Sequence, residues 1–131
     1  MGKSMLKELP RVNQRAEEPR RRIFRSTDID LVVWIAEDGH YIGFELSYRH
    51  GPRERSLRWK TGAGYTHHRV DDGEGRAGRH KGAPLMVPDG AFKRWSVARK
   101  FQIASRDIDP EVAGFVMRKV IAFGSGRNAR G

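Results

Sequence analysis

The alternation of apolar and polar positions in DIDLVVWIAEDGHYIGFELSY, residues 28–48, predicts two antiparallel strands. Asp38-Gly39 between the two apolar runs favours a two-residue type I′ turn, which needs positive φ at both central positions. This turn sets a register with Ile35 opposite Ile42, Val33 opposite Phe44, and Leu31 opposite Leu46. These apolar side chains then share one face, so a slip of one residue is costly. On the other face Trp34 lies opposite Gly43, where the ring can cover the bare backbone.

Two further strands are predicted by the same alternation in RSLRWK, residues 55–60, and YTHHRV, residues 65–70. If residues 61–64 form the loop between them, Trp59 lies opposite Thr66 and Leu57 lies opposite His68. Residues 71–90 hold five glycines and two prolines, which is typical of a long loop.

The C-terminal third shows helical spacing. Asp109 suits an N-cap, Pro110 the first helical position, and Gly124 the end of the helix. One apolar stripe follows from this placement: Val112, Phe115, Val116, Val120 and Phe123. An earlier helix over residues 91–104 is predicted by a second apolar set: Phe92, Trp95, Ala98 and Phe101.

These elements predict an α+β fold, an antiparallel four-stranded meander followed by two C-terminal helices packed on one sheet face. Residues 22–124 form the expected single domain, and residues 125–131 a flexible tail. Residues 1–21 contain few apolar side chains and are expected to be a disordered basic arm. Half of the net charge of +10 lies within residues 1–26, which hold eight basic and three acidic side chains.

Composition narrows the chemistry. The chain has no cysteine, so disulfides, thiolate metal ligands and a cysteine nucleophile are excluded. Its opening residues lack an apolar stretch long enough for a signal peptide or a membrane span. We therefore expect a cytoplasmic protein without a membrane partner, and the sequence gives no reason to expect a cofactor.

Histidines and carboxylates gather in YTHHRVDDGEGRAGRH, residues 65–80. His67 and His68 are adjacent in a predicted strand, so they point to opposite faces and cannot share a metal. The glycines of residues 73–78 match the spacing G-x-G-x-x-G, but Gly82 and Pro84 interrupt the helix that a dinucleotide site needs. A small enzyme using the end of this strand is the alternative function, with acid–base residues His68, Asp71, Asp72 and Glu74.

A non-catalytic binding or regulatory module is the leading prediction. On the predicted register one sheet face displays aromatic and basic side chains that can stack bases and hold phosphates: Trp34, Tyr41, Arg58, Lys60, Tyr65, His67 and Arg69. The basic arm adds attraction for nucleic acid that does not depend on sequence. A protein or a small molecule is the other partner class that the sequence leaves open.

The segments DLVVW, GFELSY, HHRVDDGE and PLMVPDG give residues 30–123 a resemblance to a family of small bacterial proteins of similar length without an established activity. The resemblance implies one intact domain, and it implies no catalytic residues.

Overall fold

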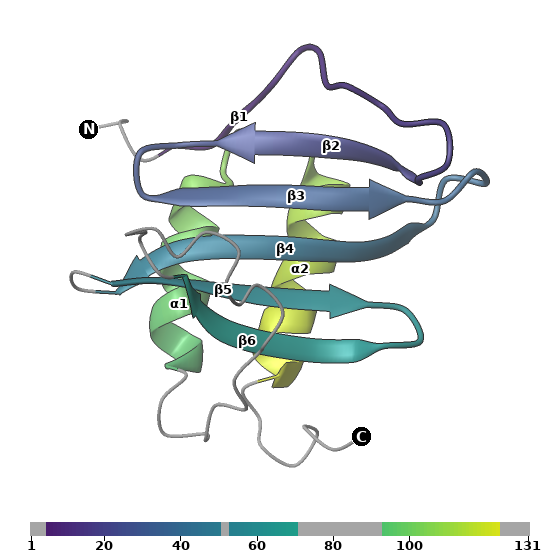
Figure 1. The fold of residues 1–131 in the computed structure, drawn as a ribbon. Coiled ribbons are helices and arrows are strands. Elements are labelled where there is room, and N and C mark those ends of the chain that lie inside the picture. Colours follow the sequence, from purple (N-terminus) through teal and green to yellow (C-terminus); the bar gives the residue numbers. More distant parts are fainter. Residues whose placement is uncertain (1–4, 51–52, 71–92, 124–131) are drawn as a thin grey trace.

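The computed structural model describes residues 5–50, 53–70 and 93–123, which form one antiparallel sheet with both helices on the same face (Figure 1). Within these residues the sheet has six strands in the order β1-β2-β3-β4-β5-β6. The strands are β1 Lys7–Glu8, β2 Arg20–Arg25, β3 Ile29–Ile35, β4 Tyr41–His50, β5 Arg53–Lys60 and β6 Gly64–Val70. The helices are α1 Arg94–Ala104 and α2 Pro110–Phe123. The predicted α+β class is confirmed, but the predicted four strands are two too few.

Of the two additional strands, β1 and the first two residues of β2 come from the region expected to be a disordered arm, residues 1–21. Lys7 pairs with Arg25 and Glu8 with Phe24, which joins β1 to β2. The side chain of Leu6 is only 1% exposed, and its backbone N–H donates to the Ala104 carbonyl at 2.9 Å. A single well-placed leucine therefore ties the start of the described chain to the end of α1, and composition alone does not reveal such a contact.

Of the β2 residues, β1 pairs only with Phe24 and Arg25, and farther along the same edge of β2 a side chain takes the place of a neighbouring strand. The Gln14 carboxamide accepts a hydrogen bond from the Arg21 N–H and donates one to the Arg21 carbonyl, each at 3.1 Å. Leu9 N–H donates to the Ile23 carbonyl at 2.9 Å. Gln14 thus occupies both outward-facing backbone groups of Arg21, as a neighbouring strand would.

The β3–β4 hairpin agrees with most of the predicted register. Leu31 pairs with Leu46, Val33 with Phe44, and Trp34 with Gly43. Ile35, however, pairs with Tyr41 instead of Ile42, because the register shifts between Trp34 and Ile35. The turn runs from Ala36 to His40, and Gly39 has a φ of 96°. The loop therefore has three residues, 37–39, with one left-handed glycine, and the predicted two-residue type I′ turn is wrong. The bulge between Trp34 and Ile35 compensates for the longer loop, so Trp34 still pairs with Gly43 as predicted.

The predicted β5–β6 register is also wrong, by one residue. Trp59 pairs with Tyr65 and Leu57 with His67, because Gly64 already belongs to β6 and pairs with Lys60. The loop is Thr61 to Ala63, closed by an Ala63 N–H to Lys60 carbonyl hydrogen bond of 3.0 Å. Shortening the loop by one residue moves every side chain of β6 to the opposite face.

The core lies between the sheet and the helices (Figure 1). The predicted α2 stripe is confirmed for Val112, Phe115, Val116 and Val120, which are buried, while Phe123 is partly buried. In α1, Trp95 is 62% exposed, so its predicted place in the core is wrong. The buried residues of α1 are instead Val97, Ala98, Phe101 and Ala104. Phe92 lies outside the described residues, as do residue 124 and the predicted tail.

A cluster of charged side chains ties β1, β2 and α2 together. The Arg22 guanidinium donates two hydrogen bonds of 2.8 Å to the Glu8 carboxylate and one of 3.3 Å to Asp109. Asp109 also caps α2, because its side chain accepts a hydrogen bond from the Glu111 N–H at 2.9 Å. The N-cap role predicted for Asp109 is therefore confirmed. In the described segments, no helix combines the length and the apolarity needed to cross a bilayer.

Candidate nucleic-acid interface

The outer sheet face, meaning the side turned away from α1 and α2, centres on Trp34. Its direct neighbour on β4 is Gly43, which has no side chain, so the indole extends across this strand toward β5. There the Arg58 guanidinium carbon and the Lys60 Nζ each lie 5.4 Å from the ring centroid. Both distances are within the range of cation–π attraction. The predicted covering of Gly43 by an aromatic ring therefore also brings two cations together around that ring.

The charges of this face are partly compensated. Glu45 accepts a hydrogen bond of 3.1 Å from Arg58 and one of 2.9 Å from the Ser56 hydroxyl. The ion pair with Glu45 holds Arg58 beside Trp34, and it also offsets part of the positive charge of Arg58. Within the described residues, Lys60 makes no ion pair with a carboxylate. Of the two cations beside Trp34, Lys60 is thus the one whose charge no described carboxylate offsets.

Sequence reasoning missed Arg21 as a member of the outer sheet face. It pairs directly with Trp34 across β2 and β3, so both side chains leave the sheet on the same side. Its guanidinium donates to the Asn13 carbonyl at 3.0 Å. The sequence signal is the run RRRIFR, residues 20–25, whose first two arginines fall in the predicted disordered arm and not in the sheet.

Two of the predicted aromatic residues lie on the opposite, helix-covered face. The Tyr41 ring packs 5.2 Å from the Phe115 ring, between centroids, and the Tyr65 ring 4.8 Å from that of Phe123. The Tyr65 hydroxyl also donates to the Lys119 carbonyl of α2 at 2.8 Å. Burial raises the pKa of Tyr65 to about 12, so the hydroxyl keeps its proton. These rings hold the helices on the sheet and are removed from the candidate interface.

His67 is likewise buried beneath the helices, with an exposed fraction of 2%. Its Nε2 shares a hydrogen bond of 2.7 Å with the Tyr48 hydroxyl, and the two rings stack with an angle of 8° between their planes. The pKa of His67 is lowered from 6.5 to about 4, mainly by burial and also by the nearby charges of Arg55 and His68. The imidazole is therefore neutral at pH 7 and carries no charge that could attract a phosphate.

Of the remaining predicted site residues, the structure describes Arg69 and His68. Arg69 pairs with Arg55 in the β5–β6 ladder. His68 pairs with Ser56 and so belongs to the outer sheet face. Asp71, Asp72 and Glu74, its partners in the alternative enzymatic site, lie outside the described residues. Among the residues that the structure describes, no group of three or more histidines and carboxylates is arranged to hold a metal ion.

The outer sheet face therefore unites Trp34, Arg58 and Lys60 from the predicted set and adds Arg21. Comparison of the chain with protein-family models, with curated proteins and with solved structures gives no match. The architecture, a six-stranded antiparallel meander with two helices on one face, and this group of side chains are thus the observations from which function is inferred.

Proposed function

We propose that the protein is a non-catalytic module that binds single-stranded nucleic acid on its outer sheet face. The observation that carries the proposal is the Trp34 ring with Arg58 and Lys60 each 5.4 Å from its centroid. Single strands are favoured over duplexes because an unpaired base can stack on an indole, whereas the bases of a helix are already stacked. Lys60 and Arg21 are the expected phosphate contacts on either side of the ring.

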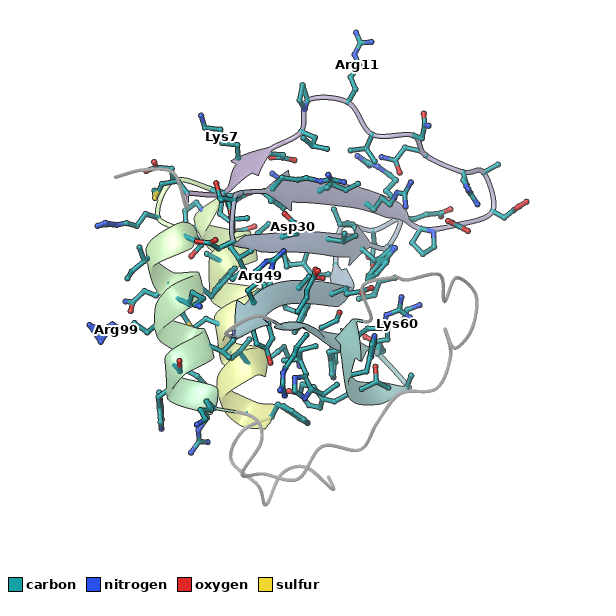
Figure 2. All side chains as sticks on the ribbon, turned by 60° about the vertical axis from the view of Figure 1, so that its left-hand side comes forward. Lys7, Arg11, Asp30, Arg49, Lys60 and Arg99 are labelled. Carbon is teal, nitrogen blue, oxygen red and sulfur yellow. The ribbon has the colours of Figure 1, made fainter. Side chains whose placement is uncertain are left out.

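The segment between β1 and β2, residues 9–19, holds two basic and two acidic side chains and so carries no net charge. Arg11 and Arg15 are exposed there, and Figure 2 shows Arg11 pointing away from the sheet. Arg15 lies 3.8 Å from Glu18, which offsets part of its charge. We therefore expect the net charge of +10 of the whole chain, and not this segment by itself, to attract any polyanion at long range. Such attraction lacks the stacking that distinguishes a base from a simple anion.

Binding of a fluorescein-labelled single-stranded RNA by the full chain, followed by anisotropy, tests the proposal. Trp34→Ala should weaken binding by about tenfold, since stacking contributes about 1–3 kcal/mol per base. A double variant, Arg21→Ala with Lys60→Ala, should reduce the slope of log K against log salt by about 1.4, at about 0.7 per phosphate contact.

Trp95→Ala and Arg99→Ala are the matched controls, because they remove an exposed indole and an exposed cation from a different part of the molecule. Each variant is first checked for unchanged unfolding by urea. If Trp34→Ala binds like the wild type while every basic substitution weakens binding equally, the affinity is only charge attraction. A protein or small-molecule partner then becomes the better explanation.

A further inference from the structure

Helix α1 has a well-defined buried side and an unusual exposed one. Among the described residues, the large hydrophobic side chains that are exposed are Trp95, at 62%, and Ile103, at 48%. Helical geometry places Arg99 and Gln102 on the same side as these two, since positions three or four apart are neighbours. We call these four residues the α1 outer surface. It lies on a helix, away from the outer sheet face (Figure 1).

Trp95 is held in place although it is exposed. The Arg94 guanidinium carbon lies 4.8 Å from the centroid of the Trp95 ring. The same guanidinium donates a hydrogen bond of 3.2 Å to the Ile121 carbonyl in the last turn of α2. Arg94 therefore links the Trp95 ring to the last turn of α2, which reduces the conformational freedom that the ring loses when a partner binds.

The charged side chains of α1 and of the residues next to it are all basic. Residues 93–106 contain five basic side chains and no Asp or Glu. Lys100 is directed to the end of β4, where its ammonium donates to the Arg49 carbonyl at 3.2 Å. Arg99 instead projects from α1 away from the sheet (Figure 2). A partner approaching this helix therefore meets an exposed indole, an aliphatic side chain and basic side chains that form no ion pair with the described carboxylates.

We propose that the α1 outer surface is a docking site for an acidic segment of another protein. Carboxylates of that segment would pair with Arg99, and an apolar side chain would fill the space between Trp95 and Ile103. Trp and Arg are the residue types that most often dominate binding energy at protein interfaces. Ile103 favours a protein partner over nucleic acid, because phosphates and sugars gain little from an aliphatic contact. A second copy of this chain is disfavoured, since it would bring the same positive charge.

Panning a phage-displayed library of random short peptides against the immobilised full chain tests this inference without assuming a partner. Selected peptides should combine Asp or Glu with an aromatic or aliphatic residue. Synthetic versions should lose about tenfold or more in affinity for Trp95→Ala and for Arg99→Glu. They should bind Trp34→Ala like the wild type, which separates this surface from the outer sheet face.

Three results would overturn the inference. These are the absence of any enriched peptide, enrichment of peptides without carboxylates, and binding that ignores both α1 substitutions. A fourth would reassign the surface: if single-stranded RNA displaces the peptides and its own binding falls with Trp95→Ala, the partner is nucleic acid. Because Ser96 is also exposed on α1, Ser96→Ala serves as a control for general disturbance of the helix.

Discussion

Acid should destabilise the fold through one buried side chain, His67. In the folded protein burial lowers the pKa of His67 to about 4, whereas in the unfolded chain it returns to about 6.5. Below pH 6.5 the unfolded state therefore binds a proton that the folded state does not. The free energy of unfolding must fall as the pH drops from 6.5 toward 4, and this contribution becomes constant below that range.

The size of the effect follows from the two pKa values. The difference between the ordinary pKa of 6.5 and about 4 in the folded protein corresponds to about 3 kcal/mol when the titration is complete. Between pH 7 and pH 5 the His67 contribution to the free energy of unfolding should decrease by about 2 kcal/mol. That is a large fraction of the stability of a typical small domain, which is about 5–15 kcal/mol.

Urea unfolding of the wild type and of His67→Gln at a series of pH values isolates this contribution. The difference in free energy between the two proteins should itself change by about 2 kcal/mol between pH 7 and pH 5. His40→Gln is the matched control, because His40 is exposed and pairs only with the exposed Asp38 among the described residues. That variant should retain the loss of about 2 kcal/mol that His67 causes between pH 7 and pH 5.

Tyr48→Phe separates burial from hydrogen bonding as the cause. It should lower stability by about 1 kcal/mol, yet keep the pH dependence, because burial is the main reason for the lowered pKa. Parallel curves for the wild type and His67→Gln would refute the reasoning. If His67→Gln does not fold, the NMR titration of the His67 ring in the wild type decides, since a midpoint near 6.5 gives the same refutation.

Three other substitutions test the packing. Leu6→Ala should lower the free energy of unfolding in urea by about 2–4 kcal/mol, whereas Lys7→Ala on exposed β1 should change it little. Equal effects of the two substitutions would mean that Leu6 does not anchor the N-terminal segment. Asp109→Ala should cost about 1 kcal/mol, and Asp109→Asn should recover most of it if capping matters more than the charge facing Arg22. Gly43→Ala should cost about 1–3 kcal/mol, because its Cβ would lie 2.9 Å from the Trp59 carbonyl oxygen. Gly114→Ala, with only an ordinary 3.5 Å contact, should be neutral or stabilising.

The sequence predicts those parts of the fold where one apolar pattern excludes its alternatives. Val33 opposite Phe44 and the α2 stripe are such cases, because a slip would expose several large side chains together. The pattern of β6 is ambiguous, since Tyr65 with His67 and Thr66 with His68 are both acceptable inner pairs by composition. Loop length decides between them, and a difference of one residue in a glycine-containing loop has no clear sequence signal.

The same ambiguity determined how much of the candidate site could be predicted. Trp34, Arg58 and Lys60 were placed together correctly because they depend on the β3–β4 and β4–β5 pairings. Tyr65 and His67 depend on the slipped β6 register and were assigned to the wrong face. Leu6 was missed for a different reason. An isolated leucine in a polar segment gives no periodicity, and its burial depends on a contact with Ala104 almost a hundred positions away.

The carboxamide of Gln14 has a consequence for how this protein behaves at high concentration. An open strand edge is a template on which the strand of another molecule can continue the sheet, which is a common start of aggregation. Here the N–H and C=O of Arg21 are both occupied by a group from the same chain, so this part of the β2 edge cannot pair with a further strand. Most of the connection between β1 and β2 is therefore free to vary in length and composition. The protection of the β2 edge at Arg21 depends on one amide side chain within this connection.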